Sequence, residues 1–400
     1  MKSKLRVGVI GVGSVVREIY RHLYFNSEFS HLLKIVAVAD PNDEFRNWFC
    51  DTFDIPPERR FAGHPEMLAN VELDAVQVNT PDHIHRDPAV DALEAGMDVV
   101  VAKPIASTVR DAHDMILAAR KNGRLLGIDF HKRADPRIKE AEARYQSGRY
   151  GVFQAAVFYM IDKLLVADPN HEPRFFASPD FAEKNSPVSF LTVHMADALI
   201  RILDLRPVEV RATAYAHKLP SLRPRPVKGL DMVDTEIRFE NGGTAHVITG
   251  WHLPNTAHAP TVQSGRIICS EGMVDLGLDT PGYRELHADA LAELNPLFRN
   301  FEKDGTVTGY GLSCPGRFYQ KFLAAHNGLL SDEDRADMMT PTELGLYTTL
   351  VLQGADESLA NGIEAAEGVT AGAAVDLADL LRREVGRDAA STYGYGAAER

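Results

Sequence analysis

Lys103, His194 and Asp197 are the residues whose types and surroundings point most clearly to proton transfer. Removal of a hydride from a secondary alcohol requires a base for the hydroxyl proton and a donor that steadies the negative charge on oxygen. A lysine performs both tasks when partial desolvation and a nearby cation lower its pKa. Lys103 follows a buried apolar run, 98–101, which predicts a place at the carboxyl edge of a sheet. An isolated lysine there would usually be a solvated strand end.

His194 and Asp197 are three residues apart in an expected helix over 190–203, and they therefore share one helical face. The carboxylate of Asp197 could accept the imidazole N–H and fix the tautomer of the ring. A core histidine on an amphipathic helix would show the same spacing. The two residues alone leave both interpretations open.

A glycine-rich turn follows the expected first strand, 5–10. Two glycines with one residue between them permit a tight turn and a close backbone approach to a pyrophosphate, which the following helix N-terminus attracts. Val16 stands where the third glycine of this fingerprint would be, so the turn alone is a weak motif. The expected cofactor contacts in the turn are Gly11, Gly13, Ser14 and Val15.

Asp40 ends the expected second strand, 34–39, where a carboxylate can accept hydrogen bonds from both ribose hydroxyls of a dinucleotide. A 2′-phosphate would meet like charge there, and no arginine follows in 41–44. The sequence therefore favours NAD over NADP. A helix cap or turn residue is the alternative interpretation of Asp40.

Residues 79–104 carry a longer pattern: a Thr-Pro turn, a histidine four residues after the proline, a helix ending in Ala-Leu-Glu-Ala-Gly, and the triplet Ala-Lys-Pro around Lys103. This pattern resembles the Gfo/Idh/MocA oxidoreductase family, which includes glucose-fructose oxidoreductase and inositol dehydrogenase. The resemblance implies that Lys103 is the catalytic lysine. Ala102 replaces the glutamate of the family's Glu-Lys-Pro triplet. The implied cofactor contacts are Thr80, Pro81, His85 and also Lys103.

The second motif of this family pairs an Asp with a His four residues later and with another Asp three residues after the His. His194 and Asp197 match it, and the resemblance implies that both belong to the reacting site. Phe190 stands at the position of the first Asp, and Thr192 at that of a common Gly. Loss of the carboxylate leaves His194 less biased toward imidazolium.

The replacement at Phe190 leaves three alternatives open. Either Lys103 and His194 suffice between them, or another acid substitutes, with Asp129 and Asp162 as candidates, or the chemistry differs from simple dehydrogenation.

A basic cluster lies at 131–133, where the expected first domain ends. Arg133 matches an arginine that the family places near the nicotinamide end of its site, and the resemblance implies a cofactor contact. A basic cluster is otherwise usually a solvated face. His83 and His85 could suggest a metal, but no further ligands have a sensible spacing, and no metal is expected. Trp251 could line a substrate pocket or pack in a core.

Two sheets must position these residues. In 1–130, short apolar runs alternate with helical patterns, which predicts a doubly wound parallel sheet of the Rossmann type that binds NAD. Longer strand candidates joined by hairpin turns follow in 131–366 and predict an α+β domain with an open, mostly antiparallel sheet for substrate binding and oligomerisation. The remainder, 367–400, is expected to be a partly flexible extension.

The composition narrows the class of protein. The 400 residues are 45% hydrophobic and 25% charged, which excludes general disorder and a coiled coil. Lys and Arg number 43 against 56 Asp and Glu, a net charge of −13, so neither nucleic acid nor a membrane is an expected partner. Three scattered cysteines suit a reducing cytosol. A signal peptide would need a small-residue cleavage site that does not follow the first strand, so a cytoplasmic location is expected.

These patterns predict an NAD-dependent oxidoreductase with Lys103 and His194 as acid and base. The resemblance implies its substrate class: a secondary hydroxyl or ketone of a sugar, sugar derivative or cyclitol. The alternatives are a redox-neutral enzyme that cleaves glycosides with recycled NAD, and a non-catalytic regulator that senses NAD. Family members usually pair through the open face of the second sheet, so a homodimer or homotetramer is expected.

Overall fold

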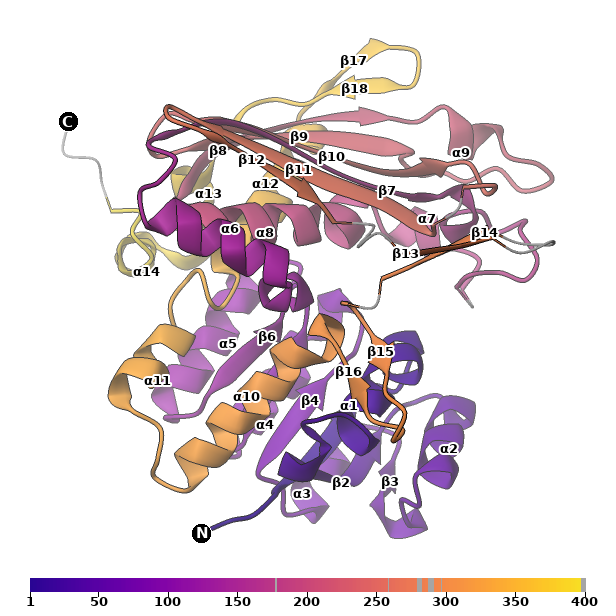
Figure 1. Ribbon diagram of the computed structural model, residues 1–400, viewed down its shortest axis with the longest axis vertical. Coiled ribbons are helices and arrows are strands. Elements are labelled where there is room, and N and C mark those ends of the chain that lie inside the picture. Colours follow the sequence, from indigo (N-terminus) through magenta and orange to yellow (C-terminus); the bar gives the residue numbers. More distant parts are fainter. Residues whose placement is uncertain (177, 258, 279–282, 287–290, 296, 397–400) are drawn as a thin grey trace. The chain divides into compact units, whose positions relative to one another are not determined.

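Short runs of valine, isoleucine and alanine form a six-stranded parallel sheet in the first part of the chain, as expected. Strands with helices on both sides are buried on both faces and read as continuous apolar runs. In the computed structural model the strand order is β3-β2-β1-β4-β5-β6 (Figure 1). The strands are β1 Leu5–Ile10, β2 Leu33–Ala39, β3 Arg60–Phe61, β4 Ala75–Val78, β5 Asp98–Ala102 and β6 Leu126–Asp129.

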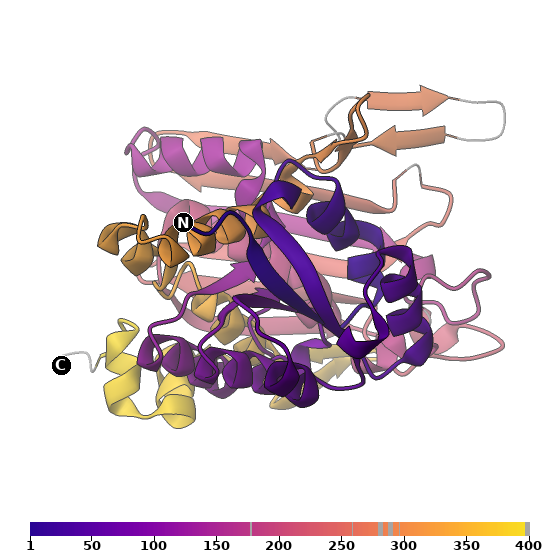
Figure 2. The same ribbon diagram turned by 90° about the horizontal axis from the view of Figure 1, so that it is seen from below.

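The order reverses between β1 and β4, and ligands of such sheets bind at the carboxyl ends of the strands beside that reversal. Figure 2 shows helices on both sides of the parallel strands. The connecting helices are α1 Arg21–Phe25, α2 Asp43–Thr52, α3 His64–Asn70, α4 Arg86–Glu94 and α5 Val109–Lys121, with short 3₁₀ turns at Ser30–Leu32, Pro57–Arg59, Asp82–Ile84 and His131–Ala134.

The helix after the glycine turn is not a regular α-helix at its start. It begins as a π-helix, η1 Val16–Tyr20, before α1. The β-branched residues Val15, Val16 and Ile19 crowd a regular helical turn and lower its propensity. The wider turn sets Tyr20 on the buried side.

The structure describes all residues except 177, 258, 279–282, 287–290, 296 and 397–400. They form two compact units, Met1–Asp135 with Leu297–Thr349, and Pro136–Pro296 with Leu350–Arg400. This division differs from the expected ranges 1–130 and 131–366, because 297–349 returns to the first unit. No helix among the described residues is long and apolar enough to cross a membrane.

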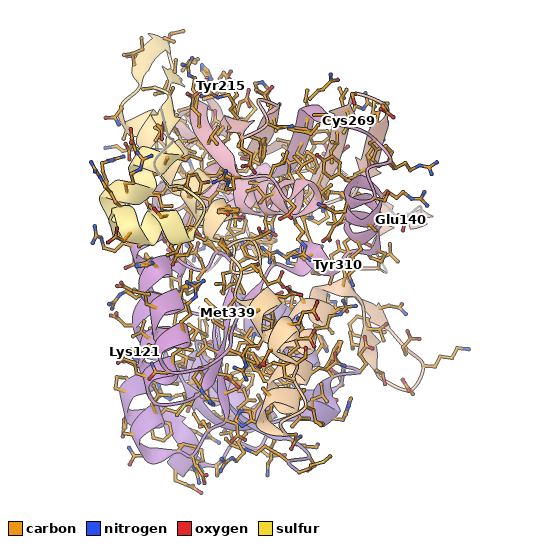
Figure 3. All side chains as sticks on the ribbon, turned by 90° about the vertical axis from the view of Figure 1, so that its left-hand side faces the viewer. Lys121, Glu140, Tyr215, Cys269, Tyr310 and Met339 are labelled. Carbon is orange, nitrogen blue, oxygen red and sulfur yellow. The ribbon has the colours of Figure 1, made fainter. Side chains whose placement is uncertain are left out.

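The returning segment covers part of the parallel sheet. Its long helix α10 Tyr310–His326 begins at Tyr310, labelled in Figure 3. Pro315 lies inside the helix, whose apolar side chains join the core of the first unit, and this packing outweighs the weak local propensity. The other elements of the segment are α11 Asp332–Met338, β15 Asn300–Phe301 and β16 Val307–Thr308.

The second unit contains a nine-stranded sheet of order β12-β11-β7-β10-β9-β8-β18-β17, with β19 also paired to β8. Within this second sheet, β7 with β10 is the only parallel pairing among the described strands, so the expected mostly antiparallel sheet is confirmed. The strands are β7 Phe153–Lys163, β8 Pro207–Tyr215, β9 Met232–Phe239, β10 Thr244–Leu253, β11 Thr261–Cys269, β12 Met273–Gly277, β17 Ile363–Ala366, β18 Val369–Ala371 and β19 Val375–Asp376.

Helices of the second unit gather on one face of this sheet, as Figure 1 shows for α6, α8 and α13. The helices are α6 Pro136–Gln146, α7 Phe181–Lys184, α8 Val193–Leu203, α9 Lys218–Ser221, α12 Leu346–Ala360, α13 Leu377–Val385 and α14 Arg387–Thr392, with a 3₁₀ turn at Leu164–Val166 and a π-helix, η7, at Val188–Thr192. A separate hairpin pairs β13 Tyr283–Leu286 with β14 Leu291–Leu294.

Residues 377–395 pack within the second unit, although the sequence suggested a partly flexible extension over 367–400. Leu377, Leu380 and Leu381 of α13 are buried, and the Tyr395 hydroxyl donates a hydrogen bond to the Pro207 carbonyl at 2.5 Å. Leucines spaced along α13 form an apolar face that the Ala- and Gly-rich composition concealed.

Candidate active site

The glycine turn after β1 has the geometry that its sequence predicts. Gly11 has a φ of +86°, and a Cβ there would lie 2.9 Å from the Asn79 carbonyl carbon, so both the conformation and the space require glycine. A Cβ on Gly13 would meet nothing within 4 Å. The turn is therefore closed against β4 at Gly11 and open at Gly13. Ser14 is exposed and Val15 is half-buried at the start of η1.

A cavity of about 440 Å³ lies beside this turn. It brings together segments that follow β1, β2 and β4, whose carboxyl ends share one edge of the sheet. Five of the predicted cofactor contacts line it: Gly11, Gly13, Asp40, Thr80 and Pro81. Its size, its open position at Gly13 and its single carboxylate fit a dinucleotide with an unmodified ribose.

Asp40 is buried at the end of β2 and is held by the backbone. Its two carboxylate oxygens accept hydrogen bonds from Val12 N and Asn42 N, each at 2.8 Å. Each oxygen keeps a second lone pair for a ribose hydroxyl. The nearby Arg46 guanidinium donates to the Asp40 carbonyl at 2.5 Å and pairs with Asp43. This arginine, which sequence reasoning missed, is therefore already engaged by an acidic partner.

His85 supports the Thr-Pro turn from behind and does not line the cavity. The ring is buried, with Nε2 2.8 Å from the Thr80 carbonyl and Nδ1 3.0 Å from the Pro104 carbonyl. Burial lowers the pKa of His85, whereas Asp82 and the carbonyl contacts raise it. His85 thus joins the loops after β4 and β5, and its contact with a cofactor stays a prediction.

Lys103 directly follows β5 and is half-buried at the carboxyl edge of the sheet. Ala102 pairs with Asp129 of the neighbouring strand β6. Asp129 is 3% exposed and accepts a hydrogen bond from the Tyr20 hydroxyl at 2.5 Å. Burial raises the pKa of Asp129 to about 6, against the lowering effects of Tyr20, Cys314 and the charge of Lys103.

Arg133 connects the first strands to the returning segment. Its guanidinium donates to the Thr342 and Glu343 carbonyls, both at 2.6 Å, and lies 4.5 Å from the centre of the Phe130 ring. Its predicted cofactor contact is not tested by these interactions. Next to it, burial lowers the pKa of His131 well below its ordinary value, as do the charges of Lys132 and Lys103.

His194 and Asp197 lie on α8 of the second unit, directly after the π-helix η7. His194 is half-buried, and Asp197 is buried. The Thr192 hydroxyl lies 2.7 Å from the Thr249 hydroxyl of β10, which fixes the end of η7 to the sheet. Both π-helices of the described residues therefore adjoin predicted functional segments, the glycine turn and His194, and π-helical turns are frequent at functional sites.

Phe190 belongs to an aromatic cluster on η7 and its surroundings. The centre of its ring lies 5.1 Å from that of Phe181, 5.7 Å from Phe176 and 6.0 Å from Trp251. Trp251 is fully buried and donates from Nε1 to the Leu230 carbonyl at 2.8 Å, so it packs in a core. The position at which the family pattern has a carboxylate is thus filled by an apolar ring within a packed cluster.

A buried polar chain that sequence reasoning missed ties α10 to the glycine turn. The Tyr319 hydroxyl donates to Gln77 Oε1 at 2.7 Å, Gln77 Nε2 donates to Asn79 Oδ1 at 3.1 Å, and Asn79 Nδ2 donates to the Gly11 carbonyl at 3.3 Å. Gln77 in an otherwise apolar strand was the one available signal. Tyr20 offered none, because its partner Asp129 is distant in sequence.

The structure brings five of the predicted dinucleotide contacts to one cavity and sets Lys103, which follows β5, beside Asp129 at the end of β6. His194 and Asp197 lie together on α8 of the other unit. Asp162 belongs to the same unit but lies on strand β7. The convergence of Lys103 and His194 on one substrate stays a prediction.

Residues 5–130 match the sequence family described as "Oxidoreductase family, NAD-binding Rossmann fold". A 1,5-anhydro-D-fructose reductase of Ensifer adhaerens is 30% identical over 154 residues, which are 38% of this chain and 44% of that relative. A D-glucoside 3-dehydrogenase of Escherichia coli strain K12 is 25% identical over 271 residues, 63% of this chain and 71% of the relative.

The fold is also similar to solved structures. A scyllo-inositol dehydrogenase from Lactobacillus casei, with bound NAD(H) and scyllo-inositol, has a TM-score of 0.69 at 15% identity, covering 94% of this chain and 99% of that one. At this identity the likeness concerns the fold.

Proposed function

Because residues 5–130 make this chain a member of the Gfo/Idh/MocA oxidoreductases, with their NAD-binding Rossmann fold, we propose that it is an NAD-dependent dehydrogenase of sugars, sugar derivatives or cyclitols. The reaction is transfer of a hydride between NAD and a secondary hydroxyl or the matching ketone. The carrying observation is the cavity between Gly13 and Asp40, on the same edge of the sheet as Lys103. The sugar substrates named for two relatives support the substrate class.

NAD supplies the hydride acceptor when it is bound. Gly11 and Gly13 let its pyrophosphate approach the backbone, and Asp40 accepts hydrogen bonds from its ribose. Lys103 takes the substrate hydroxyl proton during oxidation and returns a proton during ketone reduction. His194 is the second acid–base group, and Asp197 orients its ring. The half-buried position of Lys103 at a strand end supports the first role.

The ring of Phe190 faces the substrate in this proposal and replaces a hydrogen-bond acceptor by an apolar surface. Aromatic rings pack well on the C–H faces of sugars. The aromatic cluster with Phe181 and Trp251 supports this role, because it holds the ring in place. We therefore expect a substrate that presents a C–H face to Phe190. We also propose that the enzyme is a homodimer or homotetramer and that it acts in the cytoplasm.

The direct test supplies NAD with a panel of sugars, glycosides and cyclitols and follows reduced nicotinamide by its absorbance. Lys103→Met should lower turnover by about a thousandfold or more while NAD affinity stays nearly unchanged, because the proton acceptor is lost but the cavity is not. Lys121→Met, at the distant end of α5, is the matched control. Retained turnover in Lys103→Met would remove Lys103 from its role. Glycoside cleavage without net nicotinamide reduction would favour the redox-neutral alternative.

A further inference from the structure

Asp129 is a buried carboxylic acid that has only one of its two oxygens satisfied. Oδ2 accepts the hydrogen bond from the Tyr20 hydroxyl, and Oδ1 has no hydrogen-bond partner among the residues that the structure describes. A buried carboxylate oxygen without a hydrogen-bond partner lowers the stability of the folded state, because it has lost the water that would solvate it. Such a group needs a reason beyond packing.

The other titratable groups around Asp129 come from three elements. Tyr20 belongs to η1 and Tyr24 to α1, whereas Cys314 and Tyr319 belong to α10. Burial raises the pKa of all four above their ordinary values, and the nearby charge of Asp129 raises them further. These groups are therefore neutral at physiological pH.

The cation that acts on Asp129 is Lys103. Its charge lowers the pKa of Asp129, and His131, which also feels that charge, is itself kept neutral by burial. The strand register explains the proximity, since Val101 pairs with Ile128 and Ala102 with Asp129. Neighbouring strands lie about 4.8 Å apart, so the residue after Ala102 emerges beside the end of β6.

We propose that Asp129, anchored by Tyr20, is a positioning residue that sets the charge of Lys103. In this chain Phe190 replaces a carboxylate of the family pattern. Asp129 provides a carboxylate at a different place, at the edge of the parallel sheet beside the proposed reacting lysine. The catalytic consequence rests on the proposed function, whereas the coupling of charges does not.

The proton balance follows directly. In alcohol oxidation, the hydride leaves the carbinol carbon for NAD, and neutral Lys103 takes the hydroxyl proton and becomes an ammonium ion. Ionised Asp129 stabilises that ammonium ion. In the reverse direction the ammonium ion returns its proton to the ketone oxygen. When Asp129 is protonated, it no longer stabilises the ammonium ion. The rates of oxidation and of reduction should therefore both depend on pH through the titration of Asp129.

The test measures the charge of Lys103 in the protein without NAD or substrate. Acetic anhydride reacts only with the neutral amine, so the labelling of the Lys103 peptide against pH, followed by mass spectrometry, gives its proton affinity. Asp129→Asn should weaken proton binding by about tenfold or more, since an opposite charge at close range is lost. Asp98→Asn, a buried carboxylate at the opposite end of β5, should leave the curve unchanged.

A second variant keeps the proposal testable if Asp129→Asn does not fold. Tyr20→Phe keeps the ring and removes the hydroxyl that lowers the pKa of Asp129. The infrared carbonyl band of protonated Asp129 should then persist to higher pH than in the wild type.

Identical labelling curves for the wild type and Asp129→Asn would overturn the inference, and so would an unchanged infrared titration in Tyr20→Phe. Coupling of the charges without turnover on any substrate would instead contradict the proposed function alone. Turnover without coupling would contradict the inference alone.

Discussion

At the residue scale, two buried carboxylates at strand ends hold neighbouring groups in place and also lie at the sites for which we propose functions. Asp40 holds the turn through Val12 N and Asn42 N and still offers lone pairs toward the cavity. Asp129 holds Tyr20 and lies beside the lysine that we propose as the reacting base. In both cases the backbone position at a strand end determines what the side chain can reach.

We expect Asp40→Ala to weaken NAD binding by about tenfold to a hundredfold, because hydrogen bonds to a charged group contribute about 1.5–3 kcal/mol. Calorimetric titration of NAD into the folded variant measures this change. Asp43→Ala, an exposed carboxylate three residues later, should bind NAD almost as the wild type does. Equal affinities of wild type and Asp40→Ala would show that the ribose does not contact Asp40.

Stability should depend on pH through Asp129. Burial raises its pKa to about 6 from an ordinary 3.8, so the folded state holds this proton more tightly than the unfolded chain does. The stabilisation is complete below about pH 4 and is lost as the pH rises through about 6. Between about pH 4 and about pH 8, the unfolding free energy of the wild type should therefore fall by up to about 3 kcal/mol relative to that of Asp129→Asn.

Urea unfolding of wild type and Asp129→Asn over this pH range measures that difference. Loss of the Tyr20 hydrogen bond shifts the whole curve of the variant but does not titrate. A constant gap between the two proteins at every pH would contradict the expected burial of an ionisable group.

At the element scale, the returning helix α10 completes the first unit. Its aromatic face belongs to the same core as β1, and Tyr319 reaches Gln77 in the middle of β4. Through Asn79 the same polar chain meets the carbonyl of Gly11. A helix that is remote in sequence thereby supports the turn that we expect to bind pyrophosphate.

Tyr319→Phe should lower the unfolding free energy by about 1–3 kcal/mol, because the Gln77 side-chain oxygen loses its donor in a buried site. The same change should weaken NAD binding by a few fold through the glycine turn. Urea unfolding and NAD titration measure the two effects. Gln320→Ala, exposed on the same helix, is the control. If the variant were less stable but bound NAD as tightly as the wild type, the expected support of the glycine turn by α10 would be contradicted.

At the scale of the whole molecule, the second sheet has an exposed apolar face that bears on assembly. Val157 is 45% exposed, Tyr159 37%, Ile268 41% and Met273 52%. These residues lie on β7, β11 and β12, which are adjacent in the sheet. An exposed apolar patch of this kind usually marks an interaction surface.

We expect a homodimer or homotetramer that buries this face, and Val157→Glu with Tyr159→Glu should dissociate it, because buried like charges repel. Sedimentation velocity at micromolar protein measures the state of assembly. Glu271→Lys, at the exposed turn before β12, is the control for a surface charge change. A monomeric wild type would contradict the prediction.

The doubly wound parallel sheet, the glycine turn and the place of Asp40 at a strand end could be predicted from sequence, because each depends on residues that are close along the chain. Apolar strand runs that alternate with helical patterns imply crossover connections between parallel strands. The turn after β1 needs glycine at position 11, and the sequence shows that glycine directly. The resemblance of 79–104 to a known family likewise rests on contiguous residues.

Tertiary structure alone decided the partners of Tyr20, Arg133 and Tyr319. Tyr20 and Asp129 are 109 residues apart, Arg133 and Glu343 are 210 apart, and Tyr319 and Gln77 are 242 apart. Local propensity contains no term for such contacts, which form only because burying apolar faces brings distant elements together. For the same reason the return of 297–349 to the first unit could not be read from its own helical pattern.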